Sequence, residues 1–172
     1  MVLLKKARNT FERDMNKLKV INSIKMKEWH KKMKSENPEF YYKLQYKRFK
    51  KIGKHPLLTT KNNLQVRNCF EKQIADFLYD NGLKFRYEPY ININRKAYFP
   101  DFLVEDTIIE VTAWKHPDAF RLSYLKKKIE DYQASNYKVI FFIPKKYRNF
   151  YKEIDRFIIS DLEILKTRIM PQ

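Results

Sequence analysis

The stretch YFPDFLVEDTIIEVTAWK, residues 98–115, decides how the core of this chain is expected to fold. Apolar residues alternate with others on both sides of Glu105-Asp106, a pattern typical of two antiparallel strands joined by a tight turn. Asp101 and Glu110 interrupt the alternation, one in each arm. The sequence therefore predicts a β-hairpin that carries one acidic residue on each strand.

A two-residue turn at Glu105-Asp106 would fix the register of this hairpin. Asp101 would then lie directly opposite Glu110, with the two Cβ atoms roughly 4.5–5.5 Å apart. Glu-Asp is not a favoured two-residue turn, and a longer loop would shift the pairing. The alternation also collects four apolar residues on the opposite face, which suits a hydrophobic core: Phe102, Val104, Ile109 and Val111.

Two carboxylates side by side on a largely apolar hairpin repel each other unless a positive charge lies close to both. A hard divalent cation such as Mg²⁺, which binds carboxylate oxygens and keeps several waters, would remove the repulsion. The other interpretation is an exposed face on which lysine or arginine neutralises Asp101 and Glu110. The hairpin alone leaves a metal site and an ordinary surface equally open.

Composition points to a folded protein with a polyanionic partner. Among 172 residues, 37 Lys and Arg stand against 20 Asp and Glu, a net charge of +17 that favours nucleic acid as a partner. Hydrophobic residues make up 44% of the chain, enough for a packed core. The single Cys69 excludes an internal disulfide and a Cys-rich zinc site, and it fits a reducing compartment.

Neither a membrane span nor a targeting segment is expected. The apolar run at residues 139–144 is far too short to cross a bilayer. Lys5 and Lys6 directly follow the apolar residues 1–4, so no signal-type apolar core can form there. We expect an intracellular, cytoplasmic protein without a membrane partner, acting at the nucleoid, or in a host cell if the chain is viral.

The positive charge is concentrated in the first third of the chain. Residues 1–60 hold 17 Lys and Arg but five Asp and Glu, so we expect a basic helical extension there and a separate core over residues 61–172. Apolar residues at helical spacing predict one long helix or two shorter ones within residues 3–34. Asn37-Pro38 is typical of the start of a further helix, and Gly53 of its end.

The helix expected after Pro38 alternates aromatic and basic residues in PEFYYKLQYKRFKK. Basic side chains can neutralise phosphates while Tyr and Phe stack on bases, although the aromatic residues could equally pack on the core. A membrane-surface helix is disfavoured by the interleaved Glu and Asn. We expect this segment to bind DNA through six basic residues: Lys43, Lys47, Arg48, Lys50, Lys51 and Lys54.

From Val66 onward the pattern is that of an α/β domain. Its elements are expected in the order α-β-β-β-α-β-α, with a mixed sheet flanked by helices. On the helix that follows Pro117-Asp118 we expect an apolar stripe of Phe120, Tyr124, Ile129 and Tyr132. The expected elements are a helix from about residue 66 closed by Asn81-Gly82, a strand at 83–93, the hairpin, a helix from 117 to about 135, a buried strand at 137–144 and a helix at 147–167.

The residues FPDF at 99–102 followed by IIEVT at 108–112 resemble the PD-(D/E)XK nuclease superfamily. Its signature is Pro-Asp on one strand and (Asp/Glu)-X-Lys on the next, within a core of the order α-β-β-β-α-β. The resemblance covers about residues 66–145 and has no counterpart for the basic N-terminal third. It implies a restriction-endonuclease-like fold and hydrolysis of DNA phosphodiester bonds with Mg²⁺ or Mn²⁺.

The resemblance also implies roles for particular residues. Asp101 and Glu110 would be metal ligands, and the carbonyl of Val111 would add another. Glu71 would be the acidic residue that the first helix often contributes to the site in this superfamily. The alternative for Glu71 is a surface residue paired with Lys72 or Arg67.

The departure from the superfamily pattern is Thr112, which stands where the signature has lysine. Lys115, just past the strand end, is the nearest basic residue that could replace it. Residues 126–128 on the next helix, all lysines, are further options, and Tyr132 and Gln133 could line the site. Alternatively, the site is inactive and the protein binds nucleic acid without cutting it.

The expected function is therefore that of a metal-dependent DNA endonuclease acting on double-stranded or branched DNA. A homing or restriction-type enzyme, a nicking enzyme and a junction resolvase all remain open, and a resolvase would be expected to act as a homodimer. His116 could serve as an acid or base near neutral pH, or it could simply begin the helix at Pro117.

Overall fold

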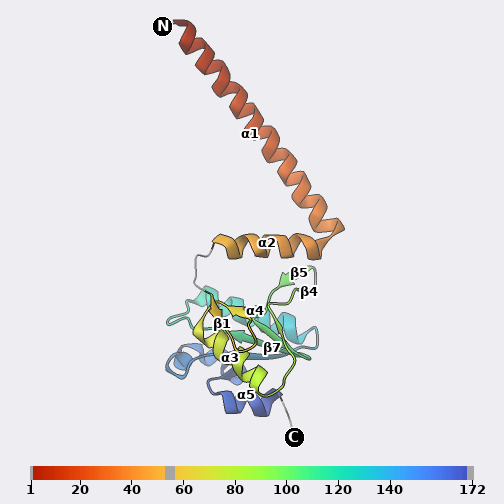
Figure 1. Ribbon diagram of the computed structural model, residues 1–172, viewed down its shortest axis with the longest axis vertical. Helices are drawn as coiled ribbons and strands as arrows, with labels where there is room; N and C mark the ends of the chain where they lie inside the picture. Colours follow the sequence, from red (N-terminus) through yellow and green to blue (C-terminus); the bar gives the residue numbers. More distant parts are fainter. Residues whose placement is uncertain (1, 53–56, 170–172) are drawn as a thin grey trace. The chain divides into compact units, whose positions relative to one another are not determined.

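The computed structural model in Figure 1 describes residues 2–52 and 57–169, and for residues 2–16 and 48–52 the backbone alone. The chain forms two compact units, residues 1–52 and 53–172. Among the expected DNA-binding residues, Lys54 lies outside the described residues, and so do the side chains of residues 48, 50 and 51.

The first unit consists of two helices, α1 (Val2–Glu36) and α2 (Pro38–Ile52), as the sequence predicts. Asn37 separates them and caps α2, because its Oδ1 accepts a hydrogen bond of 3.2 Å from the backbone N–H of Phe40. Neither of these helices, nor any other in the described part of the chain, is long and apolar enough to span a bilayer.

The second unit is mixed α/β, with a mixed five-stranded sheet flanked by helices, as expected. In the strand order β3-β6-β7-β8-β9, β6 is antiparallel to both β3 and β7, and β8 and β9 run parallel to β7. The strands are β3 (Arg86–Tyr87), β6 (Phe102–Val104), β7 (Thr107–Val111), β8 (Lys138–Phe142) and β9 (Ile158–Ile159).

The predicted register of the β6–β7 hairpin is confirmed. Leu103 pairs with Ile108 and Val104 pairs with Thr107, so Glu105 and Asp106 form a two-residue turn. Glu105 adopts a left-handed φ of 50°, the conformation that such a turn demands and that Gly or Asn would adopt at lower cost.

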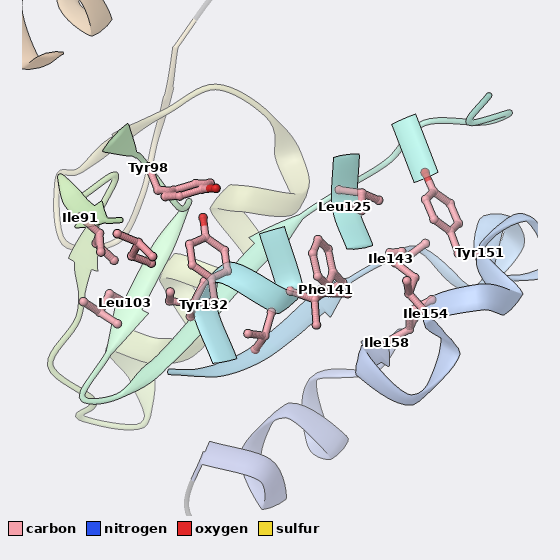
Figure 2. Packing of buried hydrophobic residues seen from close by; sticks show 14 residues of the cluster. Ile91, Tyr98, Leu103, Leu125, Tyr132, Phe141, Ile143, Tyr151, Ile154 and Ile158 are labelled. Carbon is pink, nitrogen blue, oxygen red and sulfur yellow. The ribbon is translucent and has the colours of Figure 1, made fainter. Parts of the chain in front are cut away.

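The sheet has a hydrophobic core on each face. On one face, the buried side chains of β6 and β7 pack with α3 (Cys69–Asp80) and α5 (Leu162–Ile169). On the other, they pack with α4 (Ala119–Gln133), and Figure 2 shows this second cluster, with Leu103 of β6 near Tyr132 of α4. The expected core face of Phe102, Val104, Ile109 and Val111 lies toward α3.

The acidic pair therefore belongs to the α4 side of the hairpin. Alternation along each strand puts Asp101 on the side of Leu103, and Glu110 on the side of Ile108. Leu103 and Ile108 are both buried in the cluster that includes α4. The acids consequently face a helix rather than open solvent.

The predicted strand at residues 83–93 is wrong in extent. β3 has two residues, and a separate hairpin follows, made of β4 (Ile91–Ile93) and β5 (Lys96–Tyr98). The strand ends because Glu88 turns to a φ of 46° and Pro89 follows it, and proline has no N–H to donate to a ladder. Asn94 and Arg95, with φ of 49° and 63°, form the turn of the new hairpin.

The predicted helix at residues 147–167 is also wrong. A kinked 3₁₀ segment, η1 (Lys145–Phe157), leads into β9, and α5 begins after it. The β-branched pair Ile158-Ile159 adds to the edge of the sheet beside Phe141 and Phe142, where it is buried.

The second unit also begins earlier than the expected boundary at residue 60. β1 (Leu58–Thr59) pairs with β2 (Gln65–Val66), which binds residues 58 and 59 to the α/β unit.

The predicted apolar stripe of α4 is wrong at two of its four positions. Phe120 and Tyr124 are exposed, whereas Ile129 and Tyr132 are buried. The core face of α4 instead continues through Leu125, because a helix turns by about 100° per residue and 125, 129 and 132 fall on one side.

Candidate functional site

Asp101 and Glu110 lie at the end of the β6–β7 hairpin. Extending the observed register by one residue puts Asp101 opposite Glu110. The Asp101 carboxylate reaches across the hairpin, because its Oδ2 accepts a hydrogen bond of 2.7 Å from the backbone N–H of Val111. Its backbone carbonyl accepts from the N–H of Glu88 at 3.0 Å, which ties the residue to the end of β3.

Glu110 is buried and contacts two side chains of α4. Its Oε1 lies 2.5 Å from Nζ of Lys128 and accepts a hydrogen bond of 2.8 Å from the hydroxyl of Tyr132. Lys128 and Tyr132 are four residues apart, so they lie one above the other on the same side of the helix. Helix α4 therefore places one cation and one neutral donor against the acidic pair.

The local charges keep Lys128 protonated. Burial alone would lower the pKa of the Lys128 ammonium, but the negative charge of Glu110, with a smaller contribution from Asp101, outweighs it, so the pKa is raised. Burial, and then the charge of Glu110, raise the pKa of Tyr132 well above its ordinary range. At neutral pH Lys128 is thus a cation and Tyr132 an uncharged hydrogen-bond donor.

For Asp101, in contrast to Lys128, the surroundings disfavour the charged form, because this carboxylate lies in a largely desolvated site beside other acids. Burial first, and then the charge of Glu110, raise the pKa of Asp101 from 3.8 to about 7. Glu71 adds to the rise, while the N–H of Val111 and the ammonium of Lys128 oppose it. One lysine does not cancel the charge of this acidic group.

The remaining negative charge of Asp101 and Glu110 suits the binding of a divalent cation. The hydrogen bonds described above use Oδ2 of Asp101 and Oε1 of Glu110, and each carboxylate has a second oxygen of the kind that Mg²⁺ binds. A cation beside the two carboxylates would reverse the rise in the pKa of Asp101, since an opposite charge favours the ionised form. Two carboxylates with water and substrate oxygens are a sufficient set for Mg²⁺.

Glu71 is buried at the start of α3 and is not the surface residue of the alternative interpretation. Its Oε2 accepts from the N–H of Arg67 and from the hydroxyl of Tyr87, both at 2.8 Å. Its Oε1 accepts from Nδ2 of Asn68 at 2.5 Å, and Lys72 pairs elsewhere, with Asp76. Its charge reaches Asp101, but within residues 2–52 and 57–169 no group of three or more His, Cys, Asp or Glu is arranged to hold a metal.

The ion pair of Glu110 involves neither Thr112 nor Lys115. Thr112 is buried just after β7, and its N–H donates to the carbonyl of Phe142 at 3.0 Å, which continues the pairing with β8. Lys115 is exposed in the loop that follows. Lys128 makes the ion pair with Glu110, and it is one of the three lysines at residues 126–128 that the sequence offered in place of the motif lysine.

The other candidates from the sequence contact different residues or are exposed. Lys126 pairs with Glu153, and Lys127 pairs with the exposed Glu130 and with Asp131, which is buried. Gln133 is exposed, and the ring of His116 packs edge-on against Phe150, with 4.6 Å between the ring centroids. In α2, Lys43 and Lys47 are exposed, and Lys43 pairs with Glu39 at 2.5 Å.

A comparison of the chain with protein-family models, curated proteins and solved structures gives no match.

Proposed function

We propose that the protein is a metal-dependent endodeoxyribonuclease, an enzyme that hydrolyses phosphodiester bonds in DNA. The observation that carries the proposal is the pair Asp101 and Glu110, held side by side against the buried ammonium of Lys128. A carboxyl group with a raised pKa, as Asp101 has, beside a buried cation is typical of functional sites, because such a cluster does not favour stability.

The topology supports a restriction-endonuclease-like core. Helix α3, the antiparallel strands β3, β6 and β7, helix α4 and the parallel strand β8 follow the order of the PD-(D/E)XK superfamily. In that superfamily the two motif acids lie at the open end of the hairpin, away from its turn. Here Asp101 directly precedes β6, and Glu110 lies near the C-terminal end of β7.

Asp101, Glu110 and the carbonyl of Val111 would hold Mg²⁺ or Mn²⁺, which would supply an activated water and charge stabilisation at the phosphate. The N–H of Val111 orients the carboxylate of Asp101 at 2.7 Å, and the hydroxyl of Tyr132 orients that of Glu110 at 2.8 Å. These donors fix the ligands before substrate arrives, which is what a preorganised site requires.

Lys128 would have the role that the motif lysine has in the superfamily, because Thr112 stands at the position of that lysine. Its ammonium is protonated and lies 2.5 Å from Oε1 of Glu110, so it is fixed beside the acids without being on the same strand. A positioned cation stabilises the negative charge that develops on the phosphate in the transition state. The exposed lysines of the first unit, Lys43 and Lys47 among them, would supply affinity for the DNA backbone.

The test is cleavage of plasmid, branched and single-stranded DNA with Mg²⁺ or Mn²⁺. We expect Asp101→Ala and Glu110→Gln to abolish cleavage, and Lys128→Ala to reduce it on the order of 10²–10³-fold. Lys115→Ala and the surface control Lys126→Ala should cleave like the wild type. An inactive wild type would exclude the enzyme, and equal cleavage by Asp101→Ala would exclude the site.

The second candidate function is a nucleic-acid-binding protein that does not cut. It is favoured by the lack of a third acidic ligand grouped with Asp101 and Glu110 in the described residues. In that case the wild type should bind DNA with the same affinity with and without Mg²⁺, and no substrate should be cleaved.

A further inference from the structure

A row of residues on α4 runs from solvent to the acidic pair. Phe120, Tyr124, Lys128 and Tyr132 are spaced by four residues, and each step turns the row by about 40° around the helix axis. Their exposed fractions fall accordingly, from 81% and 50% to 8% and 0%. The row therefore leads two exposed aromatic rings toward the buried end that contacts Glu110.

The row is continuous at its inner end. Nζ of Lys128 lies 5.6 Å from the ring centroid of Tyr124 and 5.8 Å from that of Tyr132, and it pairs with Glu110. Phe120 lies one further turn away, about 12 Å along the helix axis from Lys128. The two exposed rings thus begin beside the proposed site of chemistry and extend away from it.

Another exposed aromatic residue, Trp114, lies on the loop between β7 and α4 and contacts a cation of α4. The guanidinium of Arg121 lies 5.2 Å from the ring centroid of Trp114, and Trp114 is 37% exposed. The hydroxyl of Tyr151 donates to the carbonyl of Trp114 at 2.9 Å, which anchors this loop to η1. An exposed aromatic ring beside a cation therefore occurs both on α4 and on the loop that follows β7.

We propose that Phe120 and Tyr124 are a stacking surface for unpaired nucleobases next to the scissile phosphate. The inference rests on the proposed function and specifies its substrate class: DNA that is single-stranded, or locally unpaired, beside the cut.

The occupant follows from the combination of ring faces and charge. Unpaired bases stack on exposed aromatic rings, whereas the bases of an intact duplex are covered by their neighbours. The exposed guanidinium of Arg121 supplies positive charge for the phosphates between such bases. An apolar protein partner would be satisfied by any large apolar side chain, which distinguishes the two occupants by experiment.

The test is binding of a labelled oligothymidylate and of a duplex of the same length, with the full chain in EDTA at about 0.2 M salt, where phosphate contacts are weakened. We expect Phe120→Ala and Tyr124→Ala each to weaken oligothymidylate binding on the order of ten-fold, with little change for the duplex. Tyr124→Phe and Phe120→Trp, which keep a ring, should bind like the wild type. Tyr79→Ala is the control, since Tyr79 is a comparably exposed tyrosine on α3.

Three results would overturn the stacking surface. They are unchanged binding by both alanine variants, an equal loss on duplex and single strand, and wild-type binding by Phe120→Leu, which keeps apolar area without a ring. Because EDTA prevents metal-dependent cleavage, the binding result does not depend on catalysis. Weaker binding by the alanine variants with no cleavage in Mg²⁺ would support stacking and reject the nuclease alone.

Discussion

At the scale of the residue, the unusual feature is a buried lysine opposite two acids. The free-energy cost of desolvating a buried ion pair is about as large as the attraction between its charges. Lys128 and Glu110 therefore contribute little net stability. Removing one partner is different, because it leaves the other charge buried and unpaired. The pair is therefore best explained by what it does for Asp101 and Glu110 rather than by folding.

Lys128→Met should destabilise the metal-free protein by about 3–5 kcal/mol at pH 8, because two carboxylates then share a partly dry site. Urea unfolding measures this, with Lys126→Met as the control. Lys126 is half exposed where it pairs with Glu153, so its loss should cost about 0–1 kcal/mol. The double variant Lys128→Met/Glu110→Gln should recover most of the stability, and a loss below about 1 kcal/mol in the single variant would show that the ion pair is not buried in solution.

Asp101 predicts a pH dependence with a definite sign. Since the folded pKa of Asp101 is raised from 3.8 to about 7, its contribution to stability is full below pH 4 and is lost as the pH rises through 7. Asp101→Asn, whose amide oxygen can still accept from Val111, should lack this loss. The free energy of unfolding of the wild type in EDTA should therefore fall relative to the variant between pH 4.5 and 8, by about 1.4 kcal/mol per pH unit at most.

Addition of Mg²⁺ should flatten that difference, because cation binding requires the ionised carboxylate. Parallel stability curves for the wild type and Asp101→Asn would mean that the pKa of Asp101 is not raised.

At the scale of the element, the β6–β7 hairpin, helix α4 and the buried strand β8 could be predicted, whereas β9 and the β4–β5 hairpin could not. A strand has a side-chain period of two, so one turn position determined that Asp101 lies opposite Glu110. The residue that supplies the cation was harder to predict, because a helix pattern shows which residues share a face but not how the helix lies over the sheet. A lysine four residues before the buried Tyr132 was the available signal for Lys128.

The strands that were missed or misjudged depend on tertiary contacts. β9 has two residues, and its isoleucines continue the apolar pattern of the preceding segment, so residues 147–167 resemble a single helix. Its strand conformation comes from pairing with β8, which local propensity does not include. The β4–β5 hairpin depends on a turn at Asn94-Arg95 whose arginine has a left-handed φ that is uncommon outside glycine.

Helix α3 offers a clean test of an element boundary. Gly82 has a φ of 68°, and the N–H groups of Gly82 and Leu83 donate to the carbonyls of Tyr79 and Leu78, the two bonds of a Schellman motif. A Cβ at Gly82 would meet nothing within 4 Å, so Gly82→Ala isolates backbone strain. We expect a loss of about 1–2 kcal/mol in urea unfolding, and a smaller loss for Gly82→Asn, since Asn tolerates this conformation.

Equal stability of Gly82→Ala and the wild type would mean that α3 ends differently in solution.

At the scale of the whole molecule, most of the net positive charge and the acidic pair belong to different units. Residues 1–52 hold 16 of the 37 basic residues against five acidic ones, whereas the acidic pair and Lys128 belong to the second unit. This division was visible in the sequence because charge asymmetry needs no knowledge of the fold. It predicts that variants of the first unit change affinity, and that variants of the acidic pair change the chemical step.

Lys47→Gln separates these two effects. Lys47 is exposed on α2, and a lysine that contacts a phosphate releases about one counterion on binding. The slope of log K against log salt for duplex binding should therefore become shallower by about 0.9 in Lys47→Gln. The control Lys166→Gln, an exposed lysine of α5, should keep the wild-type slope. Cleavage at saturating protein should be unchanged in both variants, whereas Asp101→Asn should keep the slope and lose cleavage. A lower cleavage rate at saturation in Lys47→Gln would mean that the basic unit takes part in the chemical step.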